Sequence, residues 1–145
     1  MTASANQDNN YKPFLPIATP GSIVWNAYPE LEGVPAKLRP ALVIANDPES
    51  HAVIVAYGTT STDKVFRGEF IIRESDPDWQ MTGLQHETKF DLGNTAKLYY
   101  TSQWFARAPS HKKQIPKPVN PVMGSLTPQA RKDAVEANEM LKKKK

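Results

Sequence analysis

The sequence predicts a mainly β (α+β) fold, consisting of a small β-barrel followed by a C-terminal helix. Residues 21–105 contain about five short segments rich in β-branched and aromatic residues, separated by turn residues. Residues 127–141 instead place apolar side chains at near-helical spacing. A chain of 145 residues is typical of one domain with a sizeable core, and the absence of cysteine excludes disulfides and thiolate metal sites.

An N-terminal arm and three strands are expected first. Residues 1–20 are polar and then proline-rich, which rules out regular strand pairing but suits an extended or disordered arm laid over a surface. The barrel is expected to span residues 21–105. Its first three strands are predicted in "SIVWNAY" (22–28), "RPALVIA" (39–45) and "HAVIVAYG" (51–58). The connection "PELEGVPAK" between the first two has the composition of a surface loop.

Two further strand signals complete the predicted barrel. The segment "GEFIIRE" (68–74) predicts a fourth strand, and "DPDWQMTG" (76–83) a turn-rich connection. The segment "NTAKLYYTSQWF" (94–105) predicts a fifth strand or a strand pair. About five short strands with turns between them favour a small β-barrel.

Residues 106–145 are expected to form a Pro/Lys-rich strap and a terminal helix. Prolines and lysines between residues 106 and 122 indicate an extended segment without its own secondary structure. Thr127 and Pro128 have the residue types preferred at the N-cap and first position of a helix. This region contains 10 Lys/Arg and 3 Asp/Glu, whereas residues 1–105 contain 8 and 12, so the basic charge belongs to the tail.

The composition also limits the cellular location and the ligands. No apolar stretch approaches the roughly 20 residues that a membrane-spanning helix needs, and the start has no secretory pattern. We therefore expect a cytoplasmic protein with no membrane contact. No zinc-protease motif or glycine-rich phosphate loop is present, so no metal or cofactor is expected.

The order of the motifs resembles the PemK/MazF family of toxin ribonucleases. The chain reads G-S-I-V-W, a Gly/Pro loop, R-P-A-L-V-I-A-N-D, then V-I-V-A-Y-G-T-T-S-T, and the similarity covers residues 21–72 well and 73–105 loosely. The resemblance implies an SH3-like β-barrel and usually a homodimer. It also implies metal-independent cleavage of single-stranded RNA by an mRNA interferase, which an antitoxin protein inhibits by occupying the RNA groove.

Arg39, Thr59 and Thr60 are the candidate catalytic residues that this resemblance implies. The arginine of the family motif falls on Arg39, and the threonine at the end of the next strand falls on Thr59, with Thr60 and Ser61 within two positions. A guanidinium has a planar fork of donors that matches phosphate oxygens, and a threonine hydroxyl can position a phosphate or a 2′-hydroxyl. Neither residue type is an obvious general base.

Further residues are candidates for RNA binding. Tyr28 and Trp79 lie in loop-like contexts and are expected to offer rings for base stacking. His51, His86 and His111 are all expected to face solvent, and His86 is singled out because its polar loop can bring it toward a cleft. The complete set of RNA-binding candidates is Lys37, Tyr28, Ser61, Lys64, Arg67, Trp79 and His86.

Alternatives with no catalysis remain open. Arg39 can be a surface residue that pairs with Glu30 or Glu32, and "GTTST" can be a polar turn without further function. Gly58 also departs from the family pattern, in which an apolar residue is commoner. The competing hypothesis is a non-catalytic SH3-like binding module, or a toxin that poisons a topoisomerase, using the same groove for a protein or nucleic acid.

Overall fold

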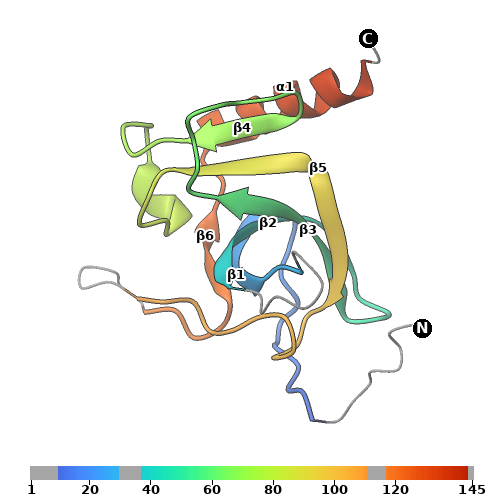
Figure 1. The fold of residues 1–145 in the computed structure, drawn as a ribbon. Helices are drawn as coiled ribbons and strands as arrows, with labels where there is room; N and C mark the ends of the chain where they lie inside the picture. The colour runs from blue at the N-terminus through green and yellow to red at the C-terminus, as the bar shows by residue number, and fades with distance from the viewer. Residues whose placement is uncertain (1–9, 30–36, 111–116, 144–145) are drawn as a thin grey trace.

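The computed structural model describes residues 10–29, 37–110 and 117–143, and it confirms a mainly β fold with one C-terminal helix (Figure 1). In the described part of the chain, six strands form one antiparallel sheet in the order β4-β5-β3-β2-β1-β6, which curls into an open half-barrel. The strands are β1 (Ser22–Ala27), β2 (Leu38–Asp47), β3 (Ala52–Thr59), β4 (Glu69–Ile72), β5 (Thr88–Tyr99) and β6 (Val122–Ser125). A short 3-10 helix, η2 (Trp79–Thr82), and the helix α1 (Pro128–Lys142) complete the fold.

Both faces of the curled sheet are buried, which explains why the central strands are apolar throughout. Successive side chains of a strand point to opposite faces, so Ile23 and Val24 of β1 enter different clusters. One cluster lies under α1 and includes Phe70 and Phe90. The other cluster contains Tyr100 and is partly covered by the N-terminal arm. In a sheet that is covered on both faces, a strand needs apolar residues at every position, so its sequence lacks the apolar–polar alternation of a half-exposed strand.

The described part of the N-terminal arm lies over the sheet, as expected for its proline-rich sequence. The amide of Phe14 donates to the carbonyl of Tyr100 at 3.1 Å, and the amide of Lys12 donates to Ser102 Oγ at 2.8 Å. Asn46 Nδ2 donates to the Ala18 carbonyl at 3.0 Å. Backbone bonds and ring packing therefore hold the arm without making it a strand of the sheet.

Strand β5 begins earlier and ends earlier than the predicted segment 94–105. Ala56 of β3 pairs with Thr95, whereas the next residue, Tyr57, pairs with Asp91, so β5 accommodates three extra residues at a bulge. The strand bends there, as Figure 1 shows. Residues 100–105 do not continue the ladder. Tyr100 is fully buried, and the turns that follow it bring Phe105 back to β1, where it forms a bridge with Asn26.

Strand β6 was not predicted: it begins at Val122, where the expected strap ends, and it pairs with β1. The N-cap prediction is confirmed: Thr127 Oγ1 accepts a hydrogen bond from the Ala130 amide at 2.9 Å. Ala130 and Ala137 bury the inner face of α1, which packs against β4 and β5. Within the described residues, no helix is long and apolar enough to cross a membrane.

Candidate functional site

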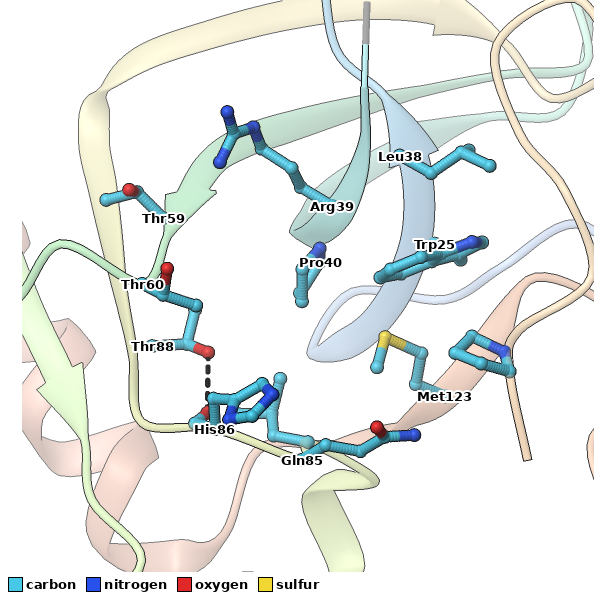
Figure 2. Close-up of a pocket in the computed structure, with 12 residues that line it drawn as sticks. Trp25, Leu38, Arg39, Pro40, Thr59, Thr60, Gln85, His86, Thr88 and Met123 are labelled. Atoms are coloured by element: carbon cyan, nitrogen blue, oxygen red, sulfur yellow. Dashed lines mark hydrogen bonds between the residues drawn. The ribbon is translucent and has the colours of Figure 1, made fainter. Parts of the chain in front are cut away.

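A pocket of about 180 Å³ at one end of the half-barrel brings together four of the predicted site residues, Arg39, Thr59, Thr60 and His86 (Figure 2). The other lining residues are Trp25, Leu38, Pro40, Leu84, Gln85, Thr88, Pro109 and Met123. Most of this lining is apolar, with the polar groups gathered toward one side, an arrangement that orients a ligand through few contacts. Sequence reasoning missed most of these additional residues, because they come from five separated segments of the chain.

Strand pairing explains why Arg39 and Thr59 meet. The β2–β3 ladder ends with Ala41 of β2 paired to Tyr57 of β3, so Arg39 and Thr59, each two residues beyond that pair, leave the ladder at the same end. The glycine at position 58 has a steric reason. A Cβ atom at this position would overlap the Pro40 carbonyl oxygen and would lie 2.9 Å from Phe90 Cε1. Glycine thus allows the two strands to close beside the pocket.

Arg39 is half-buried at the mouth of the pocket. Its guanidinium carbon lies 6.0 Å from the centroid of the Tyr57 ring, at the outer limit of a cation–π contact. Figure 2 shows the guanidinium on the side of the pocket that carries Thr59 and Thr60. Glu30 and Glu32, the alternative partners considered from the sequence, lie outside the described residues.

The two threonines differ in how firmly they are held. Thr59 is half-buried, and its Oγ1 accepts a hydrogen bond from the amide of Ser61 at 3.1 Å. Because that bond uses only an acceptor lone pair, the Thr59 hydroxyl can still donate to a bound oxygen. Thr60 is exposed and follows at the rim. The pair therefore offers one hydroxyl oriented by a hydrogen bond and one exposed hydroxyl on the same wall.

Residues 83–88 form the opposite wall and fix the backbone at His86. Thr88 Oγ1 donates to the carbonyl of His86 at 2.9 Å, as Figure 2 shows. Gly83 has φ +70°, and a Cβ there would overlap the Met123 carbonyl, so only glycine lets this segment pack on β6. The His86 side chain itself is exposed and turned into the pocket.

A buried ion pair anchors the loop that follows Thr60. Lys89 pairs with Thr59 in the β3–β5 ladder, and its Nζ lies 3.1 Å from Glu69 Oε1. The same ammonium donates to the Lys64 carbonyl at 2.8 Å, and both ion-pair side chains are only 11% exposed. Lys89 therefore ties the loop at residues 60–68 to β5, a role that its sequence context did not indicate.

Tyr28 does not offer a ring for base stacking, so that prediction was wrong. The side chain is 6% exposed, and its hydroxyl donates to Asn94 Oδ1 at 2.7 Å. Its ring packs edge-to-face on Tyr57, with centroids 5.2 Å apart. Burial, followed by the negative charge of Asp91 and the Tyr57 hydroxyl, raises the pKa of Tyr28. Tyr28 is therefore a core residue between β1 and β5.

The other predicted RNA-binding residues lie outside the pocket lining. Trp79 is half-buried against the core, which leaves only part of its ring for stacking. Arg67 is exposed and its Nη1 donates to the Lys143 carbonyl at 3.0 Å. The remaining candidates are exposed on segments adjoining the pocket: Lys37, Ser61 and Lys64.

The histidines occupy different environments. His51, expected to face solvent, is instead half-buried, and its Nε2 lies 2.8 Å from the carbonyl oxygen of Phe14 in the arm. His86 is exposed, as expected for a polar loop. His111 lies outside the described residues.

No group of three or more His, Asp or Glu side chains is placed to hold a metal ion in the described part of the chain. The polar groups of the pocket are a guanidinium, hydroxyls, an amide and an imidazole, which suit an anionic ligand.

No protein-family model matches the chain, and no curated protein matches it.

Proposed function

We propose that this protein is an endoribonuclease toxin of the PemK/MazF type, which cleaves single-stranded RNA by attack of the substrate's own 2′-hydroxyl. One observation carries the proposal: Arg39, at the start of β2, and Thr59 and Thr60, at the end of β3, line one pocket. The similarity of motifs by itself indicated only which residues could take part in the reaction. Their convergence on one concave site supports a shared chemical role.

Each of these residues has a role in the proposed reaction. Arg39 contacts the non-bridging phosphate oxygens and stabilises the additional negative charge of the pentacoordinate phosphorane. The oriented Thr59 hydroxyl donates to a phosphate oxygen or holds the attacking 2′-oxygen, and Thr60 assists at the rim. The products are a 2′,3′-cyclic phosphate and a 5′-hydroxyl. Because the nucleophile belongs to the substrate and Arg39 supplies the positive charge, the proposed reaction does not require a metal.

RNA affinity is proposed to come from cations that flank the pocket. Residues 1–105 carry a net charge of −4, so the average charge of this region opposes a polyanion. Lys37 and Lys64 are exposed on segments that run directly into the pocket-lining residues Leu38 and Thr60. We expect this local positive charge, rather than the tail, to bind the RNA backbone near the cleavage site.

The finer features of the family are part of the same proposal. They are an SH3-like classification of the half-barrel, a homodimer, a cytoplasmic location and an antitoxin protein that inhibits growth arrest by covering the pocket. An inhibitory peptide would present a carboxylate to Arg39, because that contact mimics a phosphate.

The test is incubation of the purified protein with single-stranded RNA in EDTA, with end-group analysis of the products. We expect cyclic-phosphate ends, and a loss of about 100- to 1,000-fold in rate for Arg39→Ala, as for removal of one preorganised charge contact. Arg131→Ala is the matched control, because Arg131 is an exposed arginine on α1 and does not line the pocket. Equal cleavage by folded Arg39→Ala would exclude the catalytic role.

The binding-module alternative predicts a different outcome of the same experiment. The wild-type protein would then bind a nucleic acid or a protein through the pocket without producing cyclic-phosphate ends. Arg39→Ala would weaken that binding, while Arg131→Ala would not.

A further inference from the structure

We infer that His86 is the general base that removes the proton from the attacking 2′-hydroxyl; this inference rests on the proposed ribonuclease function. Arg39 and the threonine hydroxyls leave that proton unassigned, because a guanidinium is not deprotonated in proteins and an alcohol is not a base at neutral pH. Among the twelve lining residues, Arg39 and His86 are the only titratable side chains. Imidazole is also the side chain most often used for proton transfer near pH 7.

The geometry suits a base that must accept and release a proton in each turnover. The hydrogen bond from Thr88 Oγ1 at 2.9 Å holds the His86 carbonyl, so the backbone of this wall is fixed while the side chain is exposed. The ring turns into the pocket and is also exposed to solvent (Figure 2), so a proton taken from the substrate can pass on to water. His51, by contrast, is held against the arm.

The charges around His86 come from three elements. Arg39 of β2 faces it across the pocket. Glu87, the next residue in the chain, has Oε1 3.5 Å from Arg73 Nη1. Lys89 of β5 pairs with Glu69 at 3.1 Å. The two neighbouring carboxylates thus have cationic partners, and within residues 10–29, 37–110 and 117–143 no carboxylate lines the pocket beside the imidazole.

The proposed step moves one proton from the 2′-hydroxyl to His86 and one from water to the leaving 5′-oxygen. An imidazole nitrogen of His86 accepts the 2′ proton as the bond from the 2′-oxygen to phosphorus forms. The bond from phosphorus to the 5′-oxygen breaks, and that oxygen takes a proton from solvent water. The hydroxide left by that water then accepts the proton held by the imidazolium, so both the enzyme and the solvent return to their starting states. Arg39 stays protonated and neutralises the phosphorane throughout.

The experiment compares kcat/KM against pH for the wild type and for His86→Gln on a short single-stranded RNA. In the wild type the rate should rise with pH and then level, because the base must be neutral to accept a proton. His86→Gln should lose that rise and be at least about 100-fold slower at pH 7, within the range for general base catalysis. Gln85→Ala, the neighbouring change, should keep the pH dependence whatever its effect on rate.

Two further measurements separate a base from a structural residue. Added imidazole should restore part of the rate to His86→Ala in proportion to its neutral form, because the exposed site admits a small base. The defect of His86→Gln should persist on a substrate with a 5′-thio leaving group, which needs no protonation. Loss of the defect on that substrate would make His86 an acid and overturn the inference.

The outcomes distinguish this inference from the proposed function. If the wild type cleaves RNA and folded His86→Gln cleaves it equally with the same pH dependence, His86 is not the base and the ribonuclease assignment stands. If the wild type yields no cyclic-phosphate ends under any of these conditions, the proposed function fails and the role of His86 fails with it. Unfolding curves of each variant show whether a lost rate reflects a lost fold.

Discussion

Gly58→Ala tests whether close approach of β2 and β3 assembles the pocket. The added Cβ would overlap the Pro40 carbonyl oxygen and lie 2.9 Å from Phe90 Cε1. Phe90 is fully buried and Pro40 contributes a backbone atom, so neither group can move away without disturbing a strand. Overpacking of this kind costs about 1–3 kcal/mol, and we expect the upper end, about 3 kcal/mol.

The expected loss corresponds to a drop of roughly 6–12 °C in Tm for a domain of this size. Urea unfolding followed by tryptophan fluorescence measures the loss in free energy of unfolding. RNA cleavage by the folded fraction is measured on the same samples. Cleavage should fall by more than the folded fraction does, because Arg39 and Thr59 separate. Gly93→Ala is the control: its Cβ would have no contact closer than 3.3 Å, from Asp91 Oδ1. Equal stability of the two variants would refute the steric reasoning.

Three other predictions concern stability. Lys89→Met should lower the free energy of unfolding by about 2–3 kcal/mol, because it leaves the Glu69 carboxylate buried without its cation; adding Glu69→Gln should recover part of that loss in a double-mutant cycle by urea unfolding. Thr127→Ala should cost about 1 kcal/mol by removing the N-cap of α1, and an unchanged unfolding midpoint would contradict this. The hydrogen bond from Lys97 lowers the pKa of Asp47 in the folded protein below its value in the unfolded chain. The ionised Asp47 carboxylate therefore stabilises the fold at pH values above the unfolded pKa, and this stabilisation is lost as the pH falls through the folded pKa. Asp47→Asn should therefore reduce the acid sensitivity of the thermal midpoint, and identical pH profiles would exclude this contribution.

The sequence predicted those elements whose own residues carry the pattern. The apolar runs of β2 and β3 and the Thr127 cap of α1 are local signals, and the structure contains all three elements. Strand β6 was missed because "VMGS" has no strand pattern and forms only through pairing with β1. The start of β5 was missed because its charged Lys89 is buried only through an ion pair from another strand.

The candidate site followed the same division. The motif similarity indicated Arg39 and Thr59, and both residues line one pocket at the end of the β2–β3 ladder. The sequence does not show which distant segments come into contact. It therefore indicated His86 as a candidate without indicating which residues lie beside it. Tyr28 was misassigned because a tyrosine after a strand has the same local sequence whether its ring is exposed or buried under another strand.

The pairing of β1 with β6 has a consequence for how the protein is made. About 95 residues separate the end of β1 from the start of β6, so at synthesis rates of 5–20 residues per second one edge of β1 waits about 5–20 s for its partner. During that time the nascent chain presents an apolar strand with unpaired backbone groups, a feature that promotes association between chains. Chaperone protection during translation should therefore matter more to the yield of this protein than its final stability does.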